Sequence, residues 1–179
     1  MNAAVAAGVS VVQYRDKCTD SGKIYEEALR LRQITKSVIF LINDRVDIAL
    51  SVDADGVHLG QKDLSYKEAR KFLGKDKIIG LTVHNVKEAL EAQAMGADYI
   101  GVSPVFVTNT KSDAGSAVGV EMIRRIRESV KIPIVAIGGI NLSNAKEVVA
   151  AGADSLCAIS AVVTKEDVKK EIQRFQELF

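Results

Sequence analysis

The stretch from residue 132 to residue 160 decides how the rest of the chain is interpreted. It reads IPIVAIGGI (132–140), then NLSNAKEVVAAGAD (141–154), then SLCAIS (155–160). The first part is a continuous apolar run, as expected of a strand buried on both faces of a parallel sheet. The last part is a second such run. The stretch therefore predicts one strand–helix–strand unit.

Two glycines interrupt this unit where its first strand ends. Gly138 and Gly139 carry no Cβ, so the backbone there can approach a ligand closely. We expect Asn141 or Ser143 to cap the following helix and Gly152 to end it. Free backbone NH groups at the start of a helix suit a phosphate. The glycine pair thus predicts a phosphate site.

The same alternation runs through the chain and predicts a parallel α/β sheet. The predicted strands are Gly8–Gln13, Val38–Ile42, Gly56–Leu59, Ile78–Val83, Tyr99–Val102, Pro133–Ile137 and Ser155–Ile159. Apolar residues at helical spacing predict helices at Lys23–Lys36, Tyr66–Leu73, Val86–Met95, Val120–Val130, Ser143–Ala151 and Lys165–Leu178.

Seven predicted strands are one fewer than a closed TIM (β/α)₈ barrel requires. The chain opens on Asn2–Ala7, which resembles the tail of a helix with no strand before it. We therefore predict a single TIM-barrel domain over residues 1–179, of which the first β-strand is missing from this chain. An open, doubly wound sheet is the alternative.

Composition excludes several classes of function. Lys and Arg number 24 and Asp and Glu 23, so no basic surplus points to nucleic acid. No apolar run approaches the roughly 20 residues of a membrane span, and the first residues lack the charged start of a signal peptide. Cys18 and Cys157 have no metal-site spacing, and we expect reduced thiols in a cytoplasmic protein.

Polar clusters follow most of the predicted strands. In a barrel the carboxyl ends of all strands lie on one face, where active sites are built, so we expect these groups to converge. The clusters are Gln13–Lys17, Asn43–Arg45, His58–Asp63, Thr82–Asn85 and Ser103–Lys111. The connection from 103 to 119 is long for an α/β unit, and such loops are often functional.

The clusters contain cations and hard oxygen ligands. Arg15, Lys17 and Lys111 offer positive charge, and Asp44 and Asp63 suit Mg²⁺ bound jointly with substrate phosphates. Together they predict a diphosphate site. Thr108 and Thr110 offer hydroxyl donors, and Gly139 and Ser160 offer backbone NH groups. The glycine site at 138–139 is left for a second substrate with one phosphate.

These residues also have structural interpretations. Arg15 and Lys17 could form surface ion pairs with Asp16 or Glu26. Asp44 could cap a helix and Asp63 a turn. His58 lies among apolar residues and suits a core position, whereas His84, at a strand end, fits either interpretation.

Taken in order along nearly the whole chain, these motifs resemble the thiamine-phosphate synthase family, also called thiamine-phosphate pyrophosphorylase. The matching motifs are Gln13-x-Arg15-x-Lys17, Asn43-Asp44-Arg45, Gly56-Val-His58-Leu-Gly60-Gln61-x-Asp63, Thr108-x-Thr110-Lys111, Ala136-Ile-Gly-Gly-Ile140 with Asn144, and Ile159-Ser160. The family is a TIM barrel, and its members are transferases of thiamine biosynthesis. They join a hydroxymethylpyrimidine diphosphate to a thiazole phosphate and release pyrophosphate.

The resemblance implies a role for each matching position. Asp44 and Asp63 would bind Mg²⁺, the one expected cofactor. Catalysis would involve Arg15, Lys17, Thr82 and Lys111. Substrate binding would involve Gln13, Tyr14, Arg15, Asp16, Lys17, Asn43, Thr82, Thr108, Thr110, Lys111, Gly139, Ile159 and Ser160. The pyrimidine diphosphate would lie at residues 13–17 and 43, and the thiazole phosphate at 108–110, 139 and 159–160. The family mechanism is dissociative: pyrophosphate leaves before the thiazole nitrogen attacks a pyrimidine-stabilised cation.

Three positions depart from the family pattern. Thr82 replaces the more usual Ser, and Ser103 stands where Gly is commoner. Pro104 stands where the related thiazole tautomerase has His, which favours the synthase. A tautomerase-like protein and an inactive ligand-binding fragment remain the alternatives. The expected partners are the two small-molecule substrates; nucleic acid and membrane are not expected, and a homo-oligomer stays open.

Overall fold

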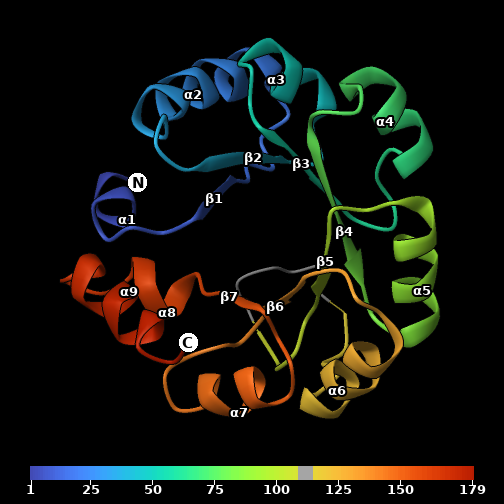
Figure 1. The fold of residues 1–179 in the computed structure, drawn as a ribbon. Helices are drawn as coiled ribbons and strands as arrows, with labels where there is room; N and C mark the ends of the chain where they lie inside the picture. The colour runs from blue at the N-terminus through green and yellow to red at the C-terminus, as the bar shows by residue number, and fades with distance from the viewer. Residues whose placement is uncertain (109–114) are drawn as a thin grey trace. The chain divides into compact units, whose positions relative to one another are not determined.

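The computed structural model describes residues 1–108 and 115–179, which form two compact units, Met1–Gly80 and Leu81–Phe179 (Figure 1). The strands follow one another in the sheet in chain order, from β1 to β7. A doubly wound sheet would reverse its strand order at a switch point. The alternative fold considered from the sequence is therefore wrong.

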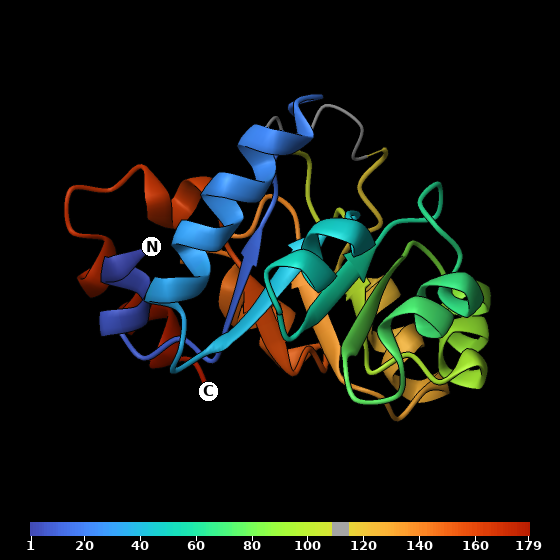
Figure 2. The ribbon, with the colours of Figure 1, turned by 90° about the horizontal axis from the view of Figure 1, so that it is seen from above.

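The first unit alternates strands and helices. Its elements are α1 (Asn2–Ala6), β1 (Val11–Tyr14), α2 (Ser21–Ile34), β2 (Ile39–Asn43), α3 (Val46–Ser51), β3 (Gly56–Leu59), α4 (Tyr66–Leu73) and the start of β4 (Ile78–Val83). Strands β1 and β2 pair in parallel, as do β2 and β3. Helices α2 and α3 lie on one face of these strands (Figures 1 and 2).

Apolar strands form the core of the first unit. Phe40, Ile42 and Val57 are almost inaccessible to water, as is Ala28 on α2. Burying side chains of the size of Phe40 or Ile42 contributes about 1.5–3 kcal/mol each. The apolar run in β2 and the complete burial of β3 reflect burial on both faces, as in parallel sheets generally.

The second unit repeats the pattern. Its elements are the end of β4, α5 (Val86–Met95), β5 (Tyr99–Val102), α6 (Val120–Ser129), β6 (Ile134–Ile137), α7 (Ala145–Ala150), β7 (Ser155–Cys157), α8 (Ser160–Val163) and α9 (Val168–Gln176). Strand β6 pairs in parallel with β5 and β7. Ile100, Ile123, Ile126 and Ile134 are fully buried between the helices and the strands.

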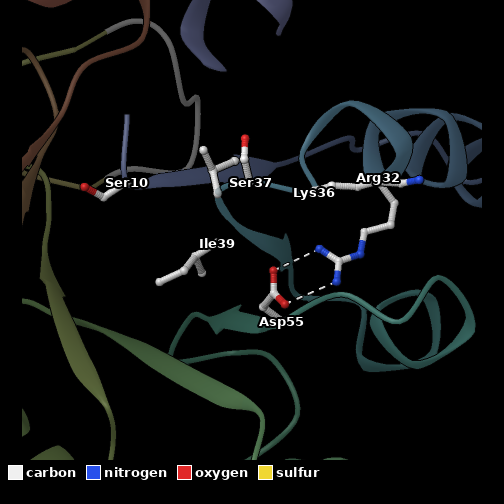
Figure 3. A pocket seen from close by; sticks show the side chains of 7 residues that line it. Ser10, Arg32, Lys36, Ser37, Ile39 and Asp55 are labelled. Carbon is white, nitrogen blue, oxygen red and sulfur yellow. Dashed lines mark hydrogen bonds and ion pairs between the residues drawn. The ribbon is translucent and has the colours of Figure 1, made fainter. Parts of the chain in front are cut away.

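In each unit, an aspartate just before a strand connects a helix to the preceding strand. In the first unit, Asp55 binds the Arg32 guanidinium through two hydrogen bonds of 3.0 and 3.3 Å and accepts the Phe40 backbone NH at 2.7 Å (Figure 3). In the second, Asp154 accepts from Arg127 at 2.9 Å and from the Ile134 NH at 2.8 Å. Each aspartate thus joins a helix to the start of the neighbouring strand.

The structure corrects three local expectations. Helix α7 begins after Asn144, and no side chain caps it, because Asn141 instead accepts the Ser143 NH at 2.9 Å within a turn. Helix α3 was considered only through the possible cap at Asp44 and was not among the helices predicted from apolar spacing. Strand β7 ends at Cys157, so Ser160 opens helix α8, also unpredicted, rather than closing a strand.

Candidate functional site

A charged cluster lies at the carboxyl ends of the strands in the first unit. Lys17 follows β1, Asp44 follows β2 and Asp63 follows β3. The Lys17 ammonium contacts the Asp44 carboxylate, and the Asp44 and Asp63 side chains hydrogen-bond to each other. The structure thus brings together three residues that the sequence analysis assigned to one site from the strand ends alone.

The pKa values of the two carboxyl groups are shifted in opposite directions. Burial raises the pKa of Asp63 above its ordinary value, and the hydrogen bond and negative charge of Asp44 raise it further. Burial acts in the same direction on Asp44, but the hydrogen bonds from Asp63 and Lys17 outweigh it and lower its pKa. Adjacent carboxylates repel unless a proton or a cation lies between them. This donor set fits a divalent cation.

The number of acidic ligands also fits Mg²⁺. The described residues contain no group of three or more His, Cys, Asp or Glu side chains placed to hold a metal ion. Mg²⁺ typically binds one or two carboxylates and completes its shell with water and substrate phosphates. Asp44 and Asp63 could hold it in this way.

The backbone of Asp44 is held in an unusual conformation. Its φ is 62°, in the left-handed region that non-glycine residues rarely occupy. Its NH donates to the His58 carbonyl at 2.9 Å, and the next NH, of Arg45, donates to the Asn43 carbonyl at 2.7 Å. Helix α3 is capped by Arg45 without a side-chain bond, so the interpretation of Asp44 as a helix cap is wrong. Strain of this kind often accompanies a functional position.

Asp63 has the structural role considered for it, in a turn, and it also contacts Asp44. Its Oδ2 accepts the Gly60 NH at 2.6 Å, which closes the turn after β3, while its carboxyl group also contacts Asp44. Ser65 caps the helix that follows. The turn holds the Asp63 side chain in place, so its structural role supports its place in the cluster.

The remaining predicted residues of the first unit lie at the ends of β1 and β2 or directly after β1. Gln13 and Tyr14 end β1, and Asn43 ends β2. The Tyr14 hydroxyl donates to Asp16 at 3.2 Å; burial, followed by the charge and hydrogen bond of Asp16, raises the pKa of Tyr14 to about 12. Arg15 lies close enough for its charge to lower the pKa of Asp44.

The second unit presents tightly packed glycines at the end of β6. Gly138 and Gly139 have φ of 101° and 66°. A Cβ on Gly138 would lie 2.7 Å from the Pro104 Cβ, and one on Gly139 would lie 2.7 Å from the Phe106 Cβ. Both positions therefore require glycine for conformation and for space.

A cavity of about 530 Å³ adjoins Gly139. The residues that line it are Val107, Thr108, Gly139, Ile140, Asn141, Ser160 and Ala161. The cavity brings together Thr108, Gly139 and Ser160, which the sequence analysis assigned to one phosphate substrate. Ile159 precedes Ser160, and Thr82 is buried in β4. Thr110 and Lys111, also predicted, lie outside the described residues.

Another cavity, of about 310 Å³, lies at the opposite, amino ends of β1 and β2. Its lining includes Arg32 and Asp55, which bind each other (Figure 3). It contains none of the predicted site residues. In parallel α/β folds, residues at the amino ends of the strands generally stabilise the fold. The Arg32–Asp55 ion pair has that role here.

Of the two histidines, the sequence analysis assigned His58 to the core and left His84 open. His58 is buried in β3, as the core interpretation predicts. His84 is part-exposed, and its Nδ1 lies 2.9 Å from Glu88 Oε2. The sequence analysis missed Glu88; the four-residue spacing from His84 into a helix was the available signal.

Comparisons with known proteins point to one family. A family model described as thiamine monophosphate synthase matches residues 1–162. The curated thiamine-phosphate synthase of Methanosarcina mazei is 54% identical over 175 residues, covering 97% of this chain and 73% of that protein. That of Chloroflexus aurantiacus is 48% identical, covering 99% and 83%.

Solved structures agree. Thiamine phosphate pyrophosphorylase from Pyrococcus furiosus superposes with a TM-score of 0.91 at 44% identity, covering 99% of this chain and 86% of that one. A 3-hexulose-6-phosphate synthase, at 17% identity and a TM-score of 0.69, shares the fold alone. The predicted TIM-barrel-like α/β fold is confirmed, with seven parallel strands among the described residues. None of the described helices is both long and apolar enough to cross a membrane.

Proposed function

Because this chain belongs to the thiamine monophosphate synthase family, and is therefore a transferase, we propose that it joins hydroxymethylpyrimidine diphosphate to thiazole phosphate, giving thiamine phosphate and pyrophosphate. The observation that carries the proposal is the cluster of Lys17, Asp44 and Asp63 at the strand ends. A tautomerase has no use for a diphosphate site, so the cluster favours the synthase.

Asp44 and Asp63 are the residues that would hold Mg²⁺. When bound, Mg²⁺ would offset the negative charge of the diphosphate and of the pyrophosphate that leaves. The Lys17 side chain is 52% exposed, so it can turn from Asp44 toward a diphosphate oxygen. Arg15 adds a second positive charge near Asp44. We assign leaving-group stabilisation to these two cations and, in the undescribed segment, to Lys111.

The cavity beside Gly139 is the proposed site of the thiazole phosphate. Thr108 and Ser160 offer hydroxyl and backbone donors, and the missing Cβ of Gly139 lets the backbone beside the cavity pack against Phe106 and Val107. The lining residues that the structure describes are all uncharged, so none of them places a negative charge against the phosphate. Binding here would hold the thiazole nitrogen ready for the electrophile.

The chemistry we propose is dissociative. The bond between the methylene carbon and the diphosphate breaks first, and the pyrimidine stabilises the resulting cation. The thiazole nitrogen then donates its lone pair to that carbon. No protein nucleophile is required, and the residues of the chain bind, orient and stabilise charge. Cys18 and Cys157 are free thiols, which suits the cytoplasm, where we place the enzyme.

The direct test is to incubate the chain with Mg²⁺ and both substrates and to measure thiamine phosphate and pyrophosphate. We expect equal amounts of the two products, and none when either substrate or Mg²⁺ is omitted. Isomerisation of a thiazole substrate without any pyrimidine would instead support the tautomerase. Binding of both substrates without product would support the inactive ligand-binding protein.

A further inference from the structure

The Asn144 side chain joins the two ends of the turn between β6 and α7. Its Nδ2 donates to the Gly139 carbonyl at 3.0 Å, and its Oδ1 accepts the Asn141 NH at 2.8 Å. Both partners precede α7, so the Asn144 side chain holds the turn rather than the helix that begins at the next residue. Asn141 Nδ2 also donates to the Gly139 carbonyl, at 3.4 Å. Two amide donors therefore fix the direction of this carbonyl.

These bonds set the orientation of the peptide group between Gly139 and Ile140. In a trans peptide the C=O and N–H bonds point in opposite directions. Because the Gly139 carbonyl points toward Asn144, the Ile140 NH points to the other side. The preceding peptide is held in a similar way, since the Gly138 carbonyl accepts the Phe106 NH at 3.0 Å. The Gly139 NH therefore points away from Phe106.

The two NH groups lie in the wall of the cavity described above. Within residues 1–108 and 115–179, neither the Gly139 NH nor the Ile140 NH donates a hydrogen bond. The described lining of the cavity includes Gly139 and Ile140 but not Asn144. Successive backbone NH groups of this kind form an anion-binding concavity. The Ile140 NH is thus a second donor, which the sequence analysis did not assign.

We propose that Asn144 is a positioning residue of the phosphate site: by holding the Gly139 carbonyl, it presents the NH groups of Gly139 and Ile140 to the phosphate of the thiazole substrate. The inference rests on the proposed function, because it concerns the site assigned there to thiazole phosphate. A glycine permits either orientation of the peptide group that follows it. In the other orientation the Gly139 carbonyl oxygen would replace the Ile140 NH and repel phosphate oxygens, since both are acceptors.

Two variants separate the two bonds of Asn144. Asn144→Ala removes both bonds and adds no charge. Asn144→Asp keeps an oxygen for the Asn141 NH but cannot donate to the Gly139 carbonyl. Ser143→Ala is the matched control in the same turn, because it removes the hydroxyl bond to Asn141 Oδ1 at 2.5 Å and leaves both bonds of Asn144 in place. All kinetics are measured below the melting temperature of each variant.

We expect Asn144→Ala to raise KM for thiazole phosphate at least tenfold, with KM for the pyrimidine diphosphate changed less than twofold. Asn144→Asp should raise KM for thiazole phosphate at least as much, because the donor is lost and a negative charge is added. Ser143→Ala should stay within twofold of the wild type for both substrates. A wild-type KM for thiazole phosphate in either Asn144 variant would overturn the proposal. An equal rise in Ser143→Ala would also overturn it, because the effect would then come from loosening of the turn.

A titration with inorganic phosphate tests the two NH groups without turnover. We expect the ¹H and ¹⁵N signals of the Gly139 and Ile140 amides to shift in the wild type and in Ser143→Ala. In Asn144→Ala the same shifts should need at least tenfold more phosphate. A wild type in which neither amide responds, or an Asn144→Ala variant that responds equally, would overturn the proposal. A wild type whose amides respond but which makes no thiamine phosphate would refute the proposed function and still support the role of Asn144 in phosphate binding.

Discussion

The carboxyl ends of the strands differ in chemistry between the two units. In the first unit they carry charge, in Lys17, Asp44 and Asp63, which contact one another. In the second unit the cavity beside Gly139 has only uncharged residues among its described lining. A metal-bound diphosphate needs compensating charge and hard oxygen ligands, whereas one phosphate can be bound by hydroxyl and backbone donors. The difference is what we expect if one substrate binds to each unit, as proposed above.

The amino ends of the strands are alike in the two units. Asp55 and Asp154 each bind the first or second NH of the preceding strand and an arginine of the helix before that strand. Repetition at this end and divergence at the other indicate that the amino ends maintain the fold while the carboxyl ends carry specificity. Four predictions test this division, from the largest expected effect to the smallest.

Asp63→Asn should have the largest effect. It removes one negative charge from the proposed metal site, and we expect kcat/KM to fall roughly 100-fold or more, since metal-ion catalysis supplies several kcal/mol. The asparagine oxygen can still accept the Gly60 NH, so the free energy of unfolding should change by less than about 1 kcal/mol. Turnover measured against Mg²⁺ concentration, beside a denaturant melt, checks both statements. Full activity at limiting Mg²⁺ would remove Asp63 from the metal site.

Gly139→Ala should mainly affect the thiazole phosphate. The new Cβ would lie 2.7 Å from the Phe106 Cβ and 2.8 Å from the Val107 carbonyl oxygen, so these residues must shift beside the cavity. We expect KM for thiazole phosphate to rise about tenfold, with a stability loss of about 1–3 kcal/mol from overpacking. KM for the pyrimidine diphosphate should stay near the wild-type value.

Gly8→Ala is the matched control for this substitution. Gly8 has a similar φ of 77°, but no atom lies within 4 Å of its Cβ position. It therefore carries the conformational strain without the clash. If both variants raised KM for thiazole phosphate equally, the effect would be one of stability and the phosphate site would be misplaced.

Much of the fold followed from apolar patterns. Strands β3, β4 and β5 and helices α4 and α5 occupy the ranges predicted from the sequence. They are bounded by polar or glycine residues that the pattern makes visible. Helices α3 and α8 were missed because six and four residues are too few to show a helical period. Strand β1 begins three residues later than predicted, since Gly8 is in the left-handed region and belongs to a turn.

The sequence allowed us to predict which residues form the candidate site, but not which of them contact one another. Lys17, Asp44 and Asp63 could be found because parallel strands place their carboxyl ends together. The left-handed backbone of Asp44 and the contact between the two aspartates depend on the folded backbone, which no local pattern encodes. The single domain and the individual roles of the site residues stay predictions.

The two amino-end aspartates should differ modestly in their contributions to stability. Asp55→Asn keeps an oxygen for the Phe40 NH but loses the charge that binds Arg32 through two bonds. We expect a loss of about 1 kcal/mol, near the upper end for partly exposed ion pairs. Asp154 is 51% exposed and makes one bond to Arg127, so Asp154→Asn should cost less than about 0.5 kcal/mol. Urea melts of both variants measure this, and activity should be unchanged; loss of activity in either would contradict the division between the two ends.

Tyr14→Phe should have the smallest effect on stability. The hydroxyl makes a surface hydrogen bond to Asp16 at 3.2 Å, and its loss at pH 7 should change the free energy of unfolding by less than about 0.5 kcal/mol. Because Tyr14 ends β1 within the predicted diphosphate site, a role in substrate binding would appear instead as a raised KM for the pyrimidine diphosphate. Paired melts and kinetics separate the two contributions.

The raised pKa of Tyr14 predicts how the free energies of unfolding of the wild type and of Tyr14→Phe change with pH. Its pKa is about 12 in the folded chain, because burial and Asp16 disfavour the phenolate, against about 10 for an unfolded tyrosine. Between these values the unfolded chain releases the Tyr14 proton and the folded chain keeps it. The stability contribution is therefore fully present below pH 10 and is lost as the pH rises toward 12. Tyr14→Phe lacks this group, so its stability should fall less steeply than that of the wild type above pH 10. Parallel slopes would mean that the Tyr14 hydroxyl is not shielded in the folded state, and that the end of β1 is more open to solvent than the Tyr14–Asp16 contact implies.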